Sequence, residues 1–309
     1  MISATRWTRW VVASAWLGTL VCATGPSVEL TGAEPLPDPI VVRLWPERAP
    51  GETADLGPEK EVVRQEERKA TRITNISQPT LSIYRAPPQN DQGTTVLVCP
   101  GGGYNYVVVD KEGTEAIAWL HSLGITGVLL KYRVPLRRDR PRHAAPLEDA
   151  QRALGLLRHR AAEWGGKGDR IGILGFSAGG HVAALASTRH ARREYAPLDA
   201  ADQVSCRPDF TLLIYPAYLT VTVDGAERLA PEVTVDGTTP PAFLVQTQDD
   251  SVKVESSLFY YLALQQAKVR GEMHVYPTGG HGYGLRLTGS GVAAWPDRAA
   301  EWLAAGGWR

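Results

Sequence analysis

One short stretch of the sequence places a serine where a nucleophile could work. Ser177 lies between Gly175 and Gly179 in the pattern G-x-S-x-G, with a run of β-type residues before it and an alanine-rich helical pattern from Ala178 onward. In a nucleophile elbow, such a sharp strand-to-helix turn lifts the serine oxygen to the carboxyl end of a parallel sheet. Glycines at such a turn can also serve packing alone. The catalytic interpretation therefore depends on partner groups elsewhere in the chain.

A second feature is a run of three glycines, Gly101 to Gly103, directly after a predicted buried strand. The run lacks the Lys-Ser/Thr of a phosphate-binding loop and the G-x-G-x-x-G pattern of a dinucleotide site. It is either a flexible turn or a cradle of backbone amides that faces a developing oxyanion. Two donors from this loop and the amide of Ala178, behind the serine, would complete an oxyanion hole.

Among the seven histidines, His281 is the best candidate for a general base. It lies in the glycine-rich stretch PTGGHGYG, directly after the last predicted strand. A base must reach the serine from the carboxyl edge of the sheet, and a loop after a strand presents it there. His181, one helical turn beyond Ser177, is expected to pack or to hydrogen-bond locally.

A carboxylate is then needed to accept the imidazole N–H and to hold its tautomer. The segment QTQDDSVKV supplies two neighbouring candidates, Asp249 and Asp250, after another predicted strand. Either could face the histidine, and the other would cap the next helix or meet solvent. The resulting chain order Ser, Asp, His is that of hydrolases built on a strand–turn–helix nucleophile. No H-E-x-x-H or C-x-x-C motif is present, so we expect neither a metal nor a cofactor.

The elements that must position these groups alternate along the chain. Buried strand patterns recur between amphipathic helical patterns, and the predicted strands are TTVLVCP, TGVLLKYRV, RIGILGFS, FTLLIYP, PAFLVQT and GEMHVYP. Repeated strand–helix alternation predicts an α/β protein with a mostly parallel central sheet and helices on both faces.

The composition limits the classes of protein to which the chain can belong. The 309 residues carry 33 basic and 33 acidic side chains, so the formal net charge is zero. A neutral chain without a basic block disfavours nucleic acid as a partner. Cys99 and Cys206 fall at opposite ends of predicted parallel strands, too far apart for a disulfide. We therefore expect two free, mostly buried thiols.

The first 33 residues resemble a secretory signal peptide, because Arg6 and Arg9 precede the apolar run WVVASAWLGTLVCA. Cleavage could follow Ala23 or Ala33, and a lipid anchor on Cys22 is disfavoured by the bulky residues before it. Residues 34–70 are rich in proline and charge and predict an extended, exposed lead-in with IVVRLWP as a possible edge strand. Residues 71–309 then form a single catalytic domain. The mature protein is expected to be secreted or periplasmic, without stable membrane insertion.

These motifs together resemble those of α/β-hydrolase fold esterases, in the acetylesterase and acetyl xylan esterase-like group of the esterase–lipase and prolyl oligopeptidase-related superfamily. The matching stretches are LWPERAPG, VCPGGGY, KYRV, PLEDAQRAL, GFSAGGH, QDDSVKVESSLFYYLAL and YPTGGHGYGL. They span nearly all of the chain after the signal peptide. The glycine loop of relatives usually reads H-G-G-G, and here Pro100 replaces that histidine.

The resemblance implies a Ser-Asp-His triad and an oxyanion hole made by Gly102, Gly103 and Ala178. The family pattern D-x-x-V selects Asp249, followed by Val252, although counting from the strand favours Asp250.

The resemblance also implies short acyl esters as substrates, including acetyl groups on carbohydrate. The alternatives are a serine peptidase related to prolyl oligopeptidases, which usually carries a propeller for which this chain has no room, and a non-catalytic recognition module on the same fold.

Overall fold

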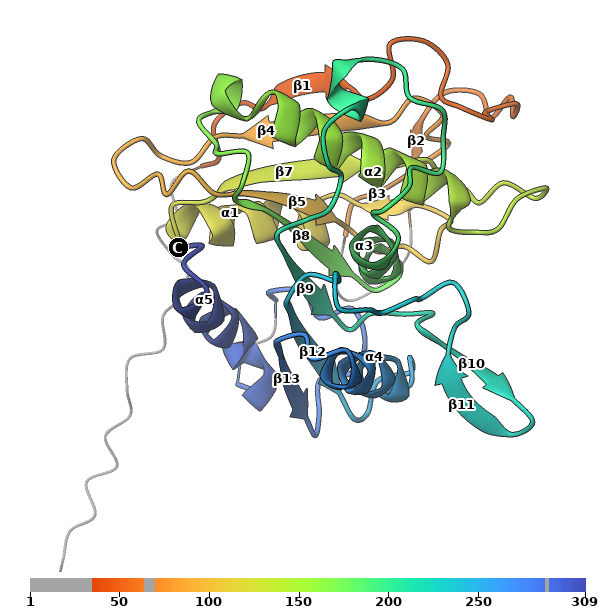
Figure 1. The fold of residues 1–309 in the computed structure, drawn as a ribbon, viewed down its shortest axis with the longest axis vertical. Helices are drawn as coiled ribbons and strands as arrows, with labels where there is room; N and C mark the ends of the chain where they lie inside the picture. Colours follow the sequence, from red (N-terminus) through yellow and green to blue (C-terminus); the bar gives the residue numbers. More distant parts are fainter. Residues whose placement is uncertain (1–34, 64–69, 287–288) are drawn as a thin grey trace, which may run out of the picture. The chain divides into compact units, whose positions relative to one another are not determined.

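A computed structural model of the chain describes residues 35–63, 70–286 and 289–309. Its core is an eight-stranded sheet in the order β1-β4-β7-β5-β8-β9-β12-β13, shown in Figure 1. From β7 to β13 all neighbouring strands are parallel, whereas β4 runs antiparallel to both β1 and β7. The expected mostly parallel sheet is confirmed.

The sheet strands and helices have the following bounds: β1 Ile40–Arg43, β4 Thr80–Tyr84, β5 Thr95–Cys99, β7 Thr126–Lys131, β8 Ile171–Phe176, β9 Phe210–Ile214, β12 Ala242–Thr247, β13 Gly271–Tyr276, α1 Glu115–Ser122, α2 Ala144–His159, α3 Ala178–Thr188, α4 Glu255–Gln266 and α5 Trp295–Ala305. A small sheet contains β2 Lys60–Glu61, β3 Arg72–Thr74 and β6 Val107–Val108, and a hairpin contains β10 Thr220–Val223 and β11 Ala226–Leu229. Short helical turns are η1 Asp110–Thr114, η2 Ala161–Trp164, η3 Ala200–Asp202 and η4 Gly291–Ala294.

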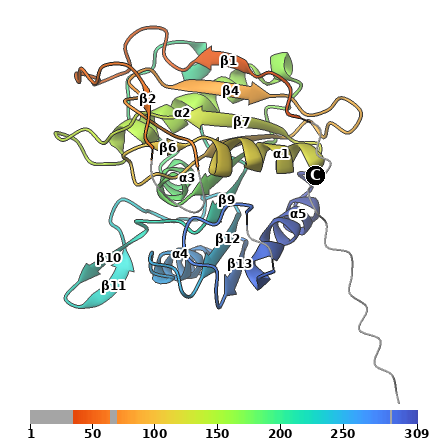
Figure 2. The same ribbon diagram turned by 180° about the vertical axis from the view of Figure 1, so that it is seen from behind.

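The central strands are buried on both faces because helices cover both. Every residue of β5, β8, β9 and β12 is buried, which explains why these strands are nearly continuous apolar runs rather than alternating ones. Helices α2, α3 and α4 pack on one face, and α1 and α5 pack on the other, as the two views in Figures 1 and 2 show.

The segment before residue 71 is more than an exposed lead-in, and this corrects the sequence-based expectation. β1 is the edge strand of the main sheet, as the sequence allowed. Beyond it, Leu44, Trp45 and Ala49 are buried in the core. The described residues from Pro35 onward form one compact unit. The predicted signal peptide lies outside the described residues.

Cys99 and Cys206 are free and buried, as expected. No helix among the described residues combines the length and apolar character needed to cross a bilayer.

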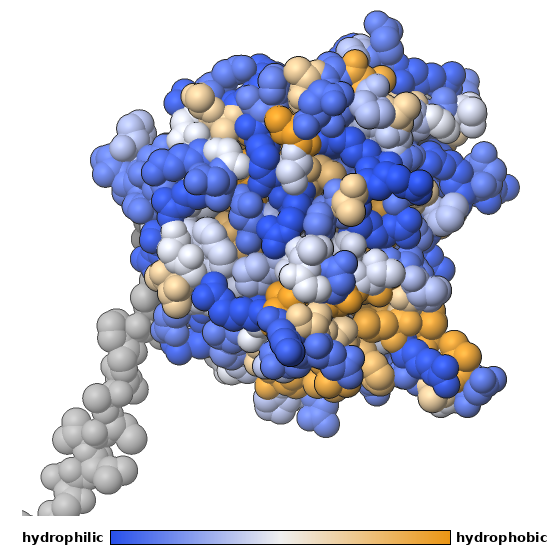
Figure 3. All heavy atoms as spheres, in the orientation of Figure 1, coloured by the Kyte–Doolittle hydropathy of each residue, from blue (hydrophilic) through white to orange (hydrophobic). Residues whose placement is uncertain are grey.

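The exposed apolar side chains of α4 and β10 lie in the orange area of Figure 3, and they include Leu258, Leu262, Val221 and Val223.

A buried ionic cluster ties the N-terminal segment to the sheet and to α2. The carboxylate of Asp149 accepts hydrogen bonds from the Trp45 indole at 2.8 Å and from the Arg133 backbone and guanidinium at 2.9 and 3.0 Å. The side chains of Arg133 and Asp149 are fully buried. Removing one partner of such a pair leaves an uncompensated charge in the core.

We therefore expect Asp149→Ala to lower the free energy of unfolding by about 3–5 kcal/mol, measured by urea denaturation. Glu163→Ala is the matched control, because its ion pair with Arg160 is solvent-exposed, and little change is expected there. An Asp149 variant as stable as the control would show that the buried cluster contributes nothing net.

Candidate active site

Ser177 lies at the tight turn that joins β8 to α3. Its backbone adopts φ 51° and ψ −119°, a conformation that non-glycine residues rarely occupy and that stores strain. Its backbone N–H donates to Ile214 O at 3.1 Å, and its carbonyl accepts from Ala217 N at 3.0 Å. The loop after β9 thus supports the strained turn, as the sequence pattern of a nucleophile elbow predicts.

The two glycines flanking Ser177 are required by close approach of the backbone. A Cβ on Gly175 would lie 2.3 Å from Gly179 O, and a Cβ on Gly179 would lie 1.9 Å from Cys99 O. Neither distance is compatible with a side chain. The glycines therefore let α3 start directly against β8 and β5, which brings the serine to the edge of the glycine loop.

His281 lies in the loop after β13 and faces the serine. Its Nε2 is 2.8 Å from Ser177 Oγ, within the range expected of a nucleophile and its base. The loop is held by Thr247, whose hydroxyl donates to Gly280 O at 2.7 Å. The ring of Tyr215 packs against the imidazole in an edge arrangement, with centroids 5.0 Å apart.

The carboxylate that faces His281 belongs to Asp250, so the sequence-based choice of Asp249 is corrected. His281 Nδ1 lies 2.8 and 2.9 Å from the two oxygens of Asp250, whose side chain is fully buried. Gln246 donates a further hydrogen bond to this carboxylate at 3.0 Å.

Asp249, one residue earlier, points to a different partner. Its carboxylate accepts from the backbone amides of Gly280 at 2.8 Å and Gly279 at 3.2 Å. The hydrogen bond from Gly280 is the main reason that the pKa of Asp249 lies below its usual value. The pattern D-x-x-V does not identify the acid, since the amide of Val252 donates to Asp250, at 2.7 Å, rather than to Asp249. The count of residues from the end of the strand, which favours Asp250, identifies the correct residue.

The glycine loop after β5 forms one wall of the site. Gly102 has φ 137°, and a Cβ there would lie 1.9 Å from Tyr106 O. Gly102 and Gly103 line the same cavity as Ser177 and His281. Ala178 is the first residue of α3, whose leading N–H groups have no intrahelical acceptor. Of the three residues expected to form the oxyanion hole, Gly102 and Gly103 thus line the cavity of the serine, and Ala178 follows it in the chain.

Glu112 is a buried residue of the site that the sequence analysis missed. Its carboxylate accepts from Gly101 N at 2.7 Å and from the Tyr215 hydroxyl at 2.9 Å. The same hydroxyl accepts from Gly284 N at 3.0 Å. Glu112 therefore links the glycine loop to the histidine loop through Tyr215. An acid shortly after the glycines was the only signal in the sequence, and it does not reveal the contact.

The serine opens into a cavity of about 370 Å³. Its lining mixes aromatic, aliphatic and charged side chains with the glycine loop, including Tyr106, Tyr218, Val252 and Lys111. A larger cavity of about 760 Å³ lies among residues 43–57 and 77–79. Neither Ser177 nor His281 lines it, so the smaller cavity is the one that opens onto the nucleophile and its base.

Comparisons with known proteins point to hydrolases. The family model described as BD-FAE matches residues 81–212. An acetylxylan esterase of Xylanibacter ruminicola is 29% identical over 220 residues, which are 64% of this chain and 42% of that protein. An endo-1,4-beta-xylanase B of Butyrivibrio fibrisolvens is 33% identical over 204 residues, which are 60% of this chain and 32% of that protein. The chain spans less than half the length of these two curated relatives.

Solved structures are also similar over most of this chain and of their own. One of them is an acetyl ester-xyloside bifunctional hydrolase from Caldicellulosiruptor lactoaceticus, with a TM-score of 0.71 and 30% sequence identity. The match covers 88% of this chain and 98% of that chain.

The two aspartates give a direct test of the site. We expect Asp250→Asn to slow covalent labelling of Ser177 by a fluorophosphonate probe by a factor on the order of 10⁴, because the imidazole would hold the wrong tautomer. Asp249→Asn should stay within about tenfold of the unmodified protein, because its amide oxygen can still accept from one of the two loop amides and this side chain does not contact the imidazole.

Labelling rates are compared at one pH, with folding verified by thermal melting. The reverse order of the two variants would show that Asp249, not Asp250, holds the base in solution.

Proposed function

This chain belongs to the acetylesterase-like group of the α/β-hydrolases, and on that premise we propose that it is a serine esterase that removes acetyl groups from carbohydrate. The observation that carries the proposal is the contact of Ser177 Oγ with His281 Nε2 at 2.8 Å, with Asp250 behind the ring. A nucleophile, a base and an orienting acid in one line are what acyl transfer requires.

In the proposed reaction, Ser177 Oγ attacks the ester carbonyl while His281 Nε2 takes the hydroxyl proton. Asp250 accepts the Nδ1–H and stabilises the imidazolium that forms. The carbonyl oxygen becomes an oxyanion that faces the amides of Gly102, Gly103 and Ala178. One such donor contributes about 3–4 kcal/mol to the transition state.

The tetrahedral intermediate collapses to an acyl-serine. The carbon–oxygen bond to the alcohol breaks, and the alcohol leaves with the proton from His281. Water then attacks the acyl-serine with His281 again as base, which releases the acid and restores Ser177. The residues perform both halves of the reaction without a change of position.

The surroundings of the serine support a small acyl group on a polar alcohol. A cavity of about 370 Å³ has to hold both parts of the ester, which leaves little room for a long chain. Tyr106 and Tyr218 line it and offer flat apolar ring faces together with hydroxyls. The segment after β9 forms only the small hairpin of β10 and β11, rather than a large lid over the serine. Acetylated sugars meet these conditions.

We expect initial rates to fall steeply from acetate to octanoate in a series of p-nitrophenyl esters, and acetylated xylo-oligosaccharide to release acetate. Ser177→Ala should lower turnover by about four to six orders of magnitude with little loss of stability. Acetate release is followed by a coupled assay, and stability by thermal melting. Preference for octanoate, or cleavage of a prolyl peptide amide without ester hydrolysis, would contradict the proposal.

We also propose that the enzyme is exported, to the periplasm or beyond the cell, where acetylated polysaccharide is met. The support is the sequence pattern of residues 1–33, with its two early arginines and its apolar run. Amino-terminal sequencing of material from the native host should give a start between about residues 24 and 34. Mature protein that retains Met1 would overturn this proposal.

A further inference from the structure

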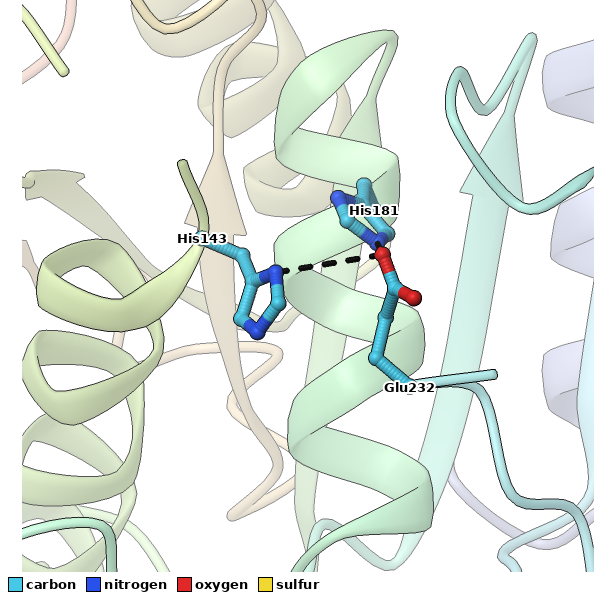
Figure 4. A group of neighbouring side chains, drawn as sticks. All are labelled: His143, His181 and Glu232. Carbon is cyan, nitrogen blue, oxygen red and sulfur yellow. Dashed lines mark ion pairs between the residues drawn. The ribbon is translucent and has the colours of Figure 1, made fainter. Parts of the chain in front are cut away.

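Three side chains suited to bind a metal converge beside α3, one turn beyond the serine. They are His143, His181 and Glu232, and Figure 4 shows both imidazoles directed toward the carboxylate. Glu232 Oε1 lies 3.9 Å from His143 Nδ1 and 3.8 Å from His181 Nε2. All three donor atoms lie within 4.8 Å of one another.

The three residues come from separate parts of the fold. His143 precedes the first residue of α2, and His181 lies within α3. Glu232 lies in the loop that follows β11. Because these residues are far apart in the sequence, no local motif contains them. The sequence-based expectation of no metal considered local motifs only.

The ring of His181 has an unused nitrogen in the protein interior. His181 is fully buried, and its Nδ1 is 2.9 Å from the Tyr104 hydroxyl. Within the part of the chain that the structure describes, its Nε2 has no hydrogen-bond partner. Glu232 is too distant to serve as one. A buried polar atom left unpaired is costly, and this one points at the other two ligands.

Burial disfavours a charged imidazole, and it is the main reason that the pKa of His181 falls to about 3 and that the pKa of His143 is lowered. If His181 Nδ1–H donates to the Tyr104 oxygen, the lone pair lies on Nε2, which is the usual arrangement of a metal-bound histidine and its supporting acceptor.

We propose that His143, His181 and Glu232 form a binding site for a divalent transition metal, for which Zn²⁺ is the best match. Two imidazoles and one carboxylate are ligands that suit zinc, whereas Ca²⁺ and Mg²⁺ prefer oxygen alone. A fourth position is left for water.

Metal binding would require the three donor atoms to move closer together. Bonds of about 2.1 Å in a tetrahedron place donor atoms about 3.4 Å apart. The distances to Glu232, 3.9 and 3.8 Å, are about half an ångström longer, and no two of the three donor atoms are more than 4.8 Å apart. Glu232 is partly exposed in a loop, so it can move. A cavity of about 510 Å³ lined by His143 and Glu232 supplies a path for entry.

Three arginines lie near the site and have to be weighed against it. Arg140 and Arg189 line the same cavity, but they are paired with Glu148 and with Glu194, respectively. Arg142 lies over the ring of Tyr218 at 4.7 Å. Arg189 is thus largely neutralised, and Glu232 adds a negative charge directly at the site.

A metal here would act as a brace for the glycine loop. It would join α2, α3 and the loop after β11, and through His181 it would orient Tyr104. Tyr104 follows Gly103 directly and stacks on Tyr218, with ring centroids 5.8 Å apart. The metal would therefore lie behind the wall of the active site without touching substrate. This inference does not depend on the esterase activity.

The test is a Zn²⁺ titration of the full-length protein after treatment with a chelator, in competition with a chromogenic zinc indicator. We expect one zinc per chain and a higher Tm when zinc is present, because the folded state binds it. His143→Ala and Glu232→Gln should each weaken binding by at least about 100-fold. Both residues are partly exposed, so the variants should fold, which thermal melting without metal verifies.

Two controls separate this site from other histidines. His274→Gln removes another histidine–carboxylate pair, in which Nε2 lies 2.8 Å from Glu272, and it should bind zinc like the unmodified protein. Ser177→Ala should also bind normally. The proposal is overturned if no stoichiometric zinc binds, if His143→Ala and Glu232→Gln bind as tightly as His274→Gln, or if binding is lost only when His281 is replaced.

Discussion

The strained turn at Ser177 is the constraint on which the rest of the structure depends. Its positive φ and the absence of side chains at Gly175 and Gly179 allow α3 to begin in contact with β5 and β8. That contact brings the nucleophile next to the glycine loop. The hydrogen bonds around Ser177 and the fully buried strands on either side offset the unfavourable free energy of the strained backbone.

Two loops must then be held in fixed positions relative to that turn. The glycine loop and the histidine loop come from opposite sides of β8, and neither is a regular element. Glu112 and Tyr215 connect them through hydrogen bonds to Gly101 and Gly284. The carboxylate of Asp249 further restrains the histidine loop, because it accepts hydrogen bonds from the backbone amides of Gly279 and Gly280. Glu112 is buried, and a satisfied hydrogen-bond network in the interior rigidifies the loops that it joins, which acid–base chemistry requires.

Much of the site was predictable because local chemistry limits it. A serine between glycines at a strand-to-helix turn, a glycine run after a strand and a histidine in a loop after the last strand each carry a local signature. The alternation of buried strands with amphipathic helices likewise determined the sheet and its two helical layers. Ser177 and His281 could therefore be named from their local patterns, whereas the resemblance to known esterases selected Gly102.

The tertiary structure decided what depends on direction or on distant segments. Asp249 and Asp250 are adjacent and chemically identical, and only the path of the turn after β12 determines which carboxylate reaches the imidazole. The role of Glu112 depends on its hydrogen bond with Tyr215, which lies about a hundred residues away in the sequence. The burial of Trp45 against Asp149 likewise depends on a contact between remote segments. His143, His181 and Glu232 meet only because α2, α3 and the loop after β11 pack together. Sequence determines the local backbone, whereas side-chain partnership across the fold is set by packing, which no local pattern encodes.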